Sequence, residues 1–364
     1  MNPELQHKLK QVRQLLKANG AEAALLGLTS NFSWLACGGE AHVPLNTDRA
    51  FGHLVVTPKD FIVLANRIEM PRLEAEVLKG LGARPIIYDW FDGSGLTAFK
   101  KIANPRKTIS DCGDFGTQSK PGLIHPLHYS LLPQEVRRLK ALGRAAESAL
   151  NETCRELQPG WTEFQIAGHL AERCWERNLT PIVLLVATDE RTRNFRHPQV
   201  SRKKLRKHAK LVLSARQHGL IVPMTRIVHF GKLSHDLRDR HDAVCLVDST
   251  LHLNTRVGTP IGEIFERAQA AYREVGFADE WKLHHQGGPC GYLGRDYLGS
   301  PTASGVVLPN QPFAWNPSIT GSKSEDTILA TVKGPQVITE ARDWPMVTIE
   351  MDDRTWQRPD ILIR

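Results

Sequence analysis

The stretch from Leu211 to Gly231 restricts the fold of this chain more than any other, because it has the pattern of two strands joined by a tight turn. The apolar run Leu211 to Leu213 predicts a buried strand, and Gly219 marks the turn. The returning strand begins at Leu220 and contains Pro223, which has no backbone N–H to donate. We therefore expect an antiparallel hairpin with one unusual residue.

The residues before this hairpin predict a small alternating α/β unit. Apolar residues between Leu5 and Leu16 recur at helical spacing, and the helix should stop at Asn19-Gly20. A turn-rich region from Asp111 to Gly122 marks the end of the unit, so we expect an N-terminal domain over residues 1–128. Between these limits we expect strands at 21–28, 52–57, 61–65 and 85–88, and helices at 71–81 and 95–102.

The chain changes character after about residue 128, and we expect a second domain over residues 129–364. A helix is predicted from Pro133 to Leu157, where Pro159-Gly160 breaks it, and a second helix starts at Thr162. The remaining pattern predicts a strand at 181–187, a third long helix at 260–275, and short strands with loops over the last hundred residues. The fold class is thus α+β.

Composition agrees with two domains and indicates the compartment. The chain has 364 residues, of which 41% are hydrophobic and 24% charged, which is enough for two buried cores. No window approaches eighteen uninterrupted apolar residues, and residues 1–20 have an amphipathic helix pattern rather than that of a signal peptide. We expect a cytoplasmic protein with no membrane partner.

Cysteine spacing and charge exclude further classes. The six cysteines form no CxxC pair, which argues against zinc ribbons, iron–sulfur sites and disulfide frameworks. The net charge of +8 raises the question of an acidic partner. The densest basic run, Ser201 to Lys210, stands just before a predicted strand and is more simply a solvated connection, which argues against nucleic acid.

Six short patterns in one order resemble the motifs of a known family. They cover nearly the whole second domain and are QPGWTE, FRHPQVS, GLIVPMTR, HHQGGPCG, NPS and SEDTILAT. In this order they resemble the creatinase and Xaa-Pro peptidase family. The resemblance implies a C-terminal pita-bread domain preceded by a smaller creatinase-like α/β domain.

The resemblance also implies where metal ligands would stand. Metallopeptidases of this family hold two divalent ions with two aspartates, one histidine and two glutamates. Matching the motifs places non-ligand residues at four of these five positions, and only Glu325 remains. The four replaced positions are Val212 to Ser214 and Pro223 for the aspartates, Gly288 for the histidine and Asn316 for a glutamate.

A one-residue slip in HHQGGPCG would place His285 at the ligand-histidine position instead of Gly288. One histidine and one glutamate would still be too few for two ions, since hard cations need several carboxylate or imidazole ligands. We therefore expect no metal and no cofactor.

Three residues are the candidates for catalysis. His197 matches the family's substrate-side histidine, and an imidazole with a pKa near ~6.5 can act as base and acid. His284 would donate to a developing oxyanion, and Glu325 would orient His197. Each has a plainer alternative. His197 could be a solvated loop histidine, His284 could cap a turn, and Glu325 could be a structural hydrogen-bond acceptor.

Five residues are candidates for substrate binding, each with a structural alternative. Arg226 would clamp a carboxylate, unless it forms an ion pair with Glu325 or Asp326. Trp315 would form an aromatic wall, although tryptophan usually packs in a core. The full set is Arg226, His285, Asn316, Asp326 and Trp315.

Three functions remain open. The first is a metal-independent C–N hydrolase or lyase, like creatinase, that acts on a small nitrogenous carboxylate. The second is a non-catalytic binding module, since a histone chaperone domain shares this fold without the metal site. The third is an Xaa-Pro metallopeptidase. Family resemblance also implies a homodimer in which Asn31 to Trp34 or Arg67 lines the partner's pocket.

Overall fold

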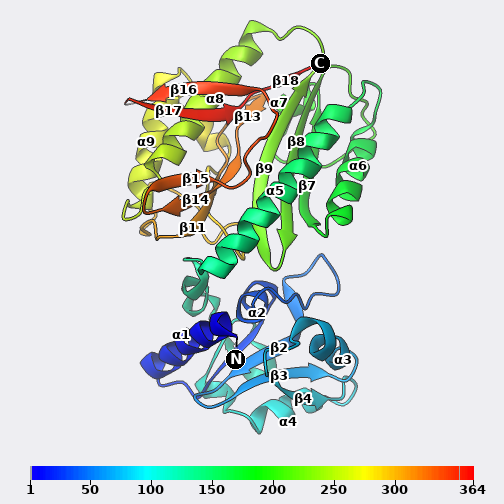
Figure 1. Cartoon of the computed structure of the whole chain (residues 1–364), viewed down its shortest axis with the longest axis vertical. Helices are drawn as coiled ribbons and strands as arrows, with labels where there is room; N and C mark the ends of the chain where they lie inside the picture. The colour runs from blue at the N-terminus through cyan, green and yellow to red at the C-terminus, as the bar shows by residue number, and fades with distance from the viewer. Residues whose placement is uncertain (1, 352) are drawn as a thin grey trace. The chain divides into compact units, whose positions relative to one another are not determined.

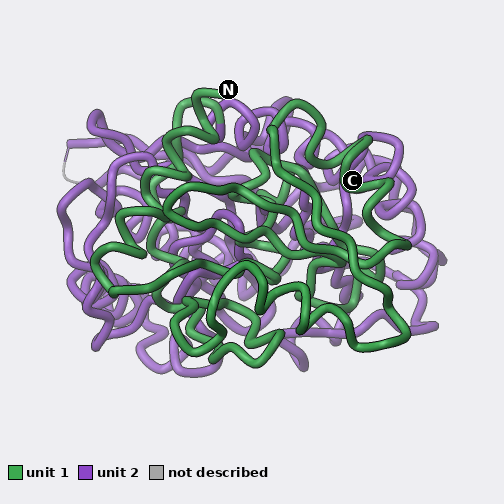
Figure 2. Tube along the Cα trace, turned by 90° about the horizontal axis from the view of Figure 1, so that it is seen from below, with its two compact units in different colours: residues 1–134, 218–220 green, residues 135–217, 221–364 purple. Residues whose placement is uncertain are grey.

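The computed structural model describes residues 2–351 and 353–364 and has the expected α+β fold (Figure 1). It divides into two compact units, residues 1–134 with 218–220 and residues 135–217 with 221–364 (Figure 2). Among the described residues, no helix is both long and apolar enough to cross a bilayer.

The first unit is built on a six-stranded sheet in the order β4-β3-β2-β1-β5-β6. Strands β1, β2 and β3 pair antiparallel, whereas β4, β5 and β6 add to them in parallel. The helix expected over 71–81 is a short α-helix followed by a π-helical turn, Leu73–Val77. The elements are α1 (Pro3–Asn19), β1 (Ala23–Leu28), α2 (Thr29–Leu35), β2 (Arg49–Val56), β3 (Phe61–Asn66), α3 (Met70–Arg72), β4 (Arg84–Tyr88), α4 (Ser94–Lys100), β5 (Thr108–Ser110) and β6 (Gln118–Ser119).

Two residues expected to line a partner's pocket lie in the core of this unit instead. Asn31 is 0% exposed and Trp34 is 1% exposed. The Asn31 amide donates to Asp111 at 2.8 Å and shares a hydrogen bond of 3.1 Å with His128. Asn31 is a buried link within its own unit, so the expectation for it and for Trp34 is wrong.

The second unit contains two four-stranded sheets, in the orders β18-β9-β8-β7 and β10-β11-β14-β15. Helices α8 and α9 pack on the second sheet through a common apolar core. The elements are α5 (Pro133–Glu156), α6 (Glu163–Glu176), β7 (Thr180–Thr188), α7 (Arg191–Asn194), β8 (His208–Gln217), β9 (Leu220–His229), α8 (His235–Asn254), α9 (Ile261–Glu274), β10 (Gly287–Pro289), β11 (Gln311–Trp315), β12 (Ser318–Ile319), β13 (Ser322–Lys323), β14 (Asp326–Thr331), β15 (Gly334–Val337), β16 (Met346–Met351), β17 (Arg354–Pro359) and β18 (Leu362–Ile363).

The hairpin expected between Leu211 and Gly231 is formed by β8 and β9. His218 and Gly219 both have positive φ, 55° and 74°, as a two-residue turn between twisted strands requires. Pro223 is tolerated within buried β9 because β18 pairs with β9 only at Val228 and His229. The Pro223 carbonyl accepts a hydrogen bond of 2.9 Å from Thr327 Oγ1.

Helix α8 has no counterpart in the sequence expectations. It begins at Ser234, whose side chain accepts from the backbone N–H of Leu237 at 3.2 Å. Twelve of its residues are buried, among them Asp248 and His252. Because polar and apolar residues are both buried around it, α8 lacks the one-sided apolar stripe by which a surface helix is recognised.

Candidate functional site

A cavity of about 200 Å³ lies over the hairpin strands in the second unit. Alternate residues of a strand share one face, so Val212 and Ser214 of β8 both line it, as do Val183 and Leu185 of β7. The cavity brings together four residues predicted for the site with two cations that were not predicted. These are His197, His285, Asn316 and Glu325, and Arg295 and Lys323.

Three imidazoles meet at this cavity. The Nε2 atoms of His284 and His197 lie 3.0 Å apart, so one ring donates to the other. The rings of His284 and His285 stack with their centroids 4.6 Å apart. Burial and then the charge of Lys323 lower the pKa of His284 to about 2, and burial and then the charge of Arg295 lower that of His285 to about 4. Burial also lowers the pKa of His197, so all three rings are neutral near pH 7.

Glu325 is held in a buried ion cluster. It is 3% exposed and accepts from Lys323 Nζ at 2.7 Å, from Arg295 at 3.1 Å and from Thr225 Oγ1 at 2.7 Å. Burial alone would raise the pKa of Glu325, but the Lys323 ammonium and the Arg295 guanidinium outweigh it and lower that pKa to about 2. Both carboxylate oxygens are therefore occupied by cations and a hydroxyl of the chain itself.

Lys210 adds a third cation beside this cluster. It stands on the same face of β8 as Val212 and Ser214 and is 2% exposed. Its Nζ donates to the carbonyl of Thr192 at 3.4 Å, and no carboxylate among the described residues pairs with it. Burial and the charge of Lys323 lower the pKa of Lys210 to about 7. The surroundings of the cavity thus hold more positive than negative charge.

Buried polar atoms at the cavity lack partners within the chain. Among the described residues that line it, Arg295 Nε and Asn316 Oδ1 are buried with no hydrogen-bond partner. Asn316 is 4% exposed, so its oxygen has little access to bulk water. Buried polar groups are almost always paired, so these atoms are available to bind a ligand in the cavity. An unpaired acceptor and an unpaired donor together fit a ligand that carries both an N–H group and an oxygen acceptor.

The residues present do not fit the pair of divalent ions that the family resemblance implies. Glu325 is the one carboxylate at the five matched positions, and two cations already neutralise it. At Gly288, where the ligand histidine would stand, a Cβ atom would lie 2.6 Å from the carbonyl oxygen of Tyr297 and 2.9 Å from the nitrogen of Gly299. No side chain can occupy that position without displacing backbone.

Gly288→Ala tests this close approach directly. We expect the free energy of unfolding to fall by about 2–3 kcal/mol, because the clash is with backbone and φ is +152°. The matched control is Gly168→Ala in α6, where nothing lies within 4 Å and alanine should stabilise by about 0.5–1 kcal/mol. Urea denaturation of both variants measures the difference, and equal stabilities would contradict the crowding at Gly288.

Two other groups of side chains have ligand atoms within 4.8 Å of one another, His197 with His284 and His285, and His53 with Cys112 and Asp114. In the first, the cations that lower the histidine pKa values also repel a divalent ion. In the second, His53 and Arg49 already bind Asp114 at 2.8 and 3.1 Å. Burial raises the pKa of the Cys112 thiol to about 12, so it stays protonated. Neither group is a strong ligand set.

Arg226, Asp326 and Trp315 do not line this cavity, which corrects the expectation that they bind substrate. Arg226 is 1% exposed and bonds Asp326 at 3.0 Å and the carbonyl of Thr339 at 3.1 Å. Trp315 is 0% exposed, and its indole N–H donates to Thr255 at 2.8 Å within the apolar core. Asp326 borders a different cavity, of about 410 Å³. Arg226 thus forms the ion pair with Asp326, and Trp315 packs in the core, as their structural alternatives stated.

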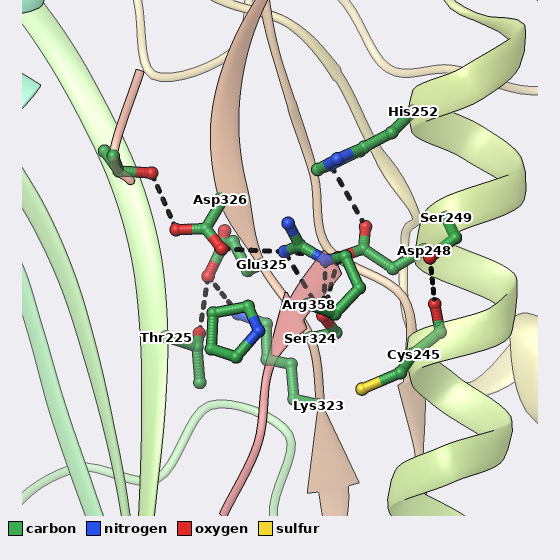
Figure 3. A network of polar contacts seen from close by, with 12 residues as sticks. Thr225, Cys245, Asp248, Ser249, His252, Lys323, Ser324, Glu325, Asp326 and Arg358 are labelled. Atoms are coloured by element: carbon green, nitrogen blue, oxygen red, sulfur yellow. Dashed lines mark hydrogen bonds and ion pairs between the residues drawn. The ribbon is translucent and has the colours of Figure 1, made fainter. Parts of the chain in front are cut away.

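Asp326 belongs to an ion network centred on Arg358, which the sequence did not reveal (Figure 3). Arg358 lies 2.7 Å from both Asp248 of α8 and Asp326 of β14. Ser324 donates to Asp248 at 2.6 Å, and the imidazole of His252 lies 3.3 Å from the same carboxylate. This network joins α8, β14 and β17 and holds the start of β14, directly after Glu325.

The missed cations of the cavity had a weak sequence signal. Lys323 precedes Glu325 by two residues, and Lys210 precedes Val212 by two, the spacing that places side chains on one face of a strand. Arg295 lies in a loop, and no local pattern indicates that it reaches Glu325.

Comparisons with known proteins identify the family and the fold. The model of metallopeptidase family M24 matches residues 137–332. An uncharacterized peptidase of Staphylococcus epidermidis is 19% identical over 359 residues, covering 92% of this chain and 99% of that protein. The structure resembles a prolidase from Thermococcus sibiricus with a TM-score of 0.78 and 16% identity, over 94% of this chain and 98% of that one.

The structure also resembles the N-terminal domain of the FACT complex subunit SPT16 from Cicer arietinum, with a TM-score of 0.70 and 10% identity, over 93% of this chain and 96% of that one. At these identities, likeness to solved structures shows the fold alone. The pita-bread fold expected from the motifs is confirmed.

Proposed function

The chain belongs to metallopeptidase family M24, and from this premise we propose that it is a metal-independent hydrolase or lyase that breaks a C–N bond of a small nitrogenous carboxylate. The observation that carries the proposal is the cavity over β8, which has an excess of cations and unpaired polar atoms where the family resemblance implies metal ions. Its composition supports recognition of a substrate by the chain's own side chains.

The cations support a carboxylate on the substrate. Arg295 and Lys323 both pair with a single buried carboxylate, that of Glu325, and Lys210 lies near Lys323. A substrate carboxylate would balance the excess charge and accept from the free Nε of Arg295. Asn316 Oδ1 would accept from an N–H group of the same molecule.

The paired histidines support proton transfer. His197 and His284 share a hydrogen bond of 3.0 Å, and because the pKa of His284 is only about 2, His197 is the ring of the pair that would take the proton. In hydrolysis, the oxygen of a water bonds to the substrate carbon and the pair takes its proton. The C–N bond then breaks, and the pair returns the proton to the leaving nitrogen.

Binding and turnover of guanidino, ureido and cyclic amidine acids test this function. We expect at least one class to raise the melting temperature, and its carboxamide analogue to have no effect. His197→Gln should abolish release of the nitrogenous product yet keep the ligand-induced shift. His7→Gln on α1 is the control, because His7 is an exposed histidine in the other unit. Full turnover by His197→Gln would refute the role of His197.

The metal content of the purified protein is a separate test. We expect elemental analysis to find no stoichiometric pair of divalent ions, and manganese to leave the activity unchanged, because Lys323 and Arg295 already neutralise Glu325. Two tightly bound ions per chain that drive cleavage of Xaa-Pro dipeptides would overturn the proposal.

The second candidate is an Xaa-Pro metallopeptidase, favoured by family membership and by the prolidase among the structural neighbours. The group of three imidazoles would be its remaining source of metal ligands. A non-catalytic binding module is the third candidate, and the SPT16 domain is its precedent for the fold. Product release in the screen above, with and without manganese, distinguishes the three.

We also propose a homodimer in the cytoplasm, as the family resemblance implies. Arg67 is the remaining candidate for contact with a partner, since its side chain is 68% exposed and pairs with Asp89 at 2.8 Å. Light scattering at micromolar concentration checks the oligomeric state.

A further inference from the structure

We propose that a second cavity beside the histidines binds an aromatic group of the substrate. This inference rests on the proposed function, because it names the class of that function's substrate. The cavity has a volume of about 450 Å³ and belongs to the second unit. The same unit contains the cavity over β8 that is lined by Arg295 and Lys323, which we call the cationic cavity. It is formed where α9 and the 3-10 turn Glu280–Leu283 meet the segment that contains His284 and His285.

This second cavity, which we call the aromatic cavity, has an apolar side formed by aromatic and aliphatic residues. Phe265 and Trp281 line it with their rings in a T-shaped contact, centroids 5.7 Å apart. Leu283 and Pro301 complete the apolar lining, and no carboxylate lines the cavity among the described residues. Aromatic side chains prefer edge-to-face partners, so an inserted aromatic ring has two surfaces to contact.

Leu283 supports a ligand at this place. It is 59% exposed although it lies at an indented surface, so a large apolar side chain is in contact with water. An apolar ligand group would cover Leu283, which is favourable in proportion to the apolar area removed from water. The lining has one lysine, Lys282, whose Nζ lies 5.9 Å from the centre of the Trp281 ring.

The aromatic and cationic cavities share a wall. His285 lines both, and its ring stacks on that of His284 with a centroid distance of 4.6 Å. A molecule whose carboxylate lies at Arg295 and whose aromatic ring lies at Trp281 therefore passes the histidines between its two ends. The bond to be broken would lie beside the group that transfers the proton.

This arrangement fits the N-aroyl or N-arylacyl derivatives of a small amino acid. The amide supplies the N–H donor for Asn316 Oδ1 and the carbonyl carbon for attack by water. The carbon gains an oxygen from water, the C–N bond breaks, and the products are an aromatic carboxylic acid and the free amino acid. The proton of the attacking water passes through the pair of His197 and His284 to the leaving amine.

Calorimetric titration of the full chain with three probes tests the inference. We expect N-benzoylglycine to bind about tenfold or more tightly than N-acetylglycine, since it buries a ring in place of a methyl group. Benzamide, which lacks the carboxylate, should bind more weakly than N-benzoylglycine. Equal affinity for the two acids would overturn the proposal that this cavity binds an aromatic group and would leave the proposed function intact. If neither acid binds, this inference falls, while the proposed function still depends on the result with guanidino, ureido and cyclic amidine acids.

A substitution at the rim of the cavity adds a second readout. Leu283→Asp places a charge where the ring would lie, and the residue is exposed enough that folding should be preserved. We expect it to weaken N-benzoylglycine about tenfold more than N-acetylglycine. The matched control is Val332→Asp, 84% exposed in the turn after β14, which should change neither affinity. Equal weakening of both acids by Leu283→Asp would overturn the assignment.

Discussion

Replacing Glu325 by glutamine should lower the free energy of unfolding by about 3–5 kcal/mol, the usual effect of removing one partner from a buried ion pair. Glu325 is 3% exposed and is the carboxylate that pairs with both Lys323 and Arg295. Without it, the buried ammonium of Lys323 would have no counter-ion. Urea denaturation at pH 7 measures the change.

The effect of Glu325→Gln should depend on pH in one direction. The folded-state pKa of Glu325 is lowered to about 2 from the ordinary 4.5. Its stabilisation is therefore complete above pH 4.5 and is lost as the pH falls toward 2. The difference between wild type and variant should shrink over that range.

Glu263→Gln is the matched control for Glu325→Gln, because Glu263 pairs with Arg267 on the surface of α9 at 2.7 Å. Surface pairs of this kind contribute about 0.2–1 kcal/mol. If Glu325→Gln had no larger effect than Glu263→Gln at pH 7, the ion cluster would not hold this site together.

Replacing Lys210 by methionine should have the opposite effect and stabilise the protein by roughly 2–4 kcal/mol at pH 6. Burial lowers the pKa of Lys210 from 10.5 to about 7, and each pKa unit corresponds to about 1.4 kcal/mol. Methionine fills similar volume without a charge. Thermal and urea unfolding of both proteins measure the gain.

The pH dependence of the Lys210→Met effect follows from the lowered pKa. Below pH 7 the lysine is charged in both states, so its full burial penalty is present in the wild type. Between pH 7 and 10.5 the unfolded state binds more protons than the folded state, so wild-type stability rises with pH. The advantage of the methionine variant should therefore disappear near pH 10.

The control for Lys210→Met is Lys101→Met, a substitution of an exposed lysine, which should change stability by less than about 0.5 kcal/mol at either pH. Equal stability of wild type and Lys210→Met at pH 6 would show that Lys210 has an unrecognised counter-ion.

Regular patterns made much of the fold predictable. The spacing of apolar residues and the turn residues predict the hairpin of β8 and β9 and helices such as α1 and α9. Helix α8 does not, because it is buried on most sides and has both polar and apolar residues inward. Asp248 and His252 of α8 complete the ion network around Arg358, so the sequence did not predict that network either.

The sequence predicts those features of the candidate site that depend only on which residue stands at a motif position. It does not predict those that depend on which side chains are buried against one another. The replacement of ligands at Pro223, Gly288 and Asn316 can be recognised by matching short motifs. Whether Arg226 points at a cavity or at Asp326 depends on residues 100 positions away, which no local pattern encodes. Likewise, the contact of Arg295 with Glu325 joins a loop to a residue 30 positions later, between β13 and β14.

If Gly288 is the ligand-histidine position, as the motif match implies, the backbone around it would make a metal site difficult to build. A histidine introduced there would meet the carbonyl of Tyr297 and the nitrogen of Gly299 before it could reach an ion. Restoring the other ligands first would place new carboxylates beside Lys323 and Arg295, where they would form ion pairs instead. A return to metal chemistry would thus require the loop at Tyr297 to move before any ligand is restored. Single substitutions made in any order would each reduce the stability of the protein or fail to bind a metal ion.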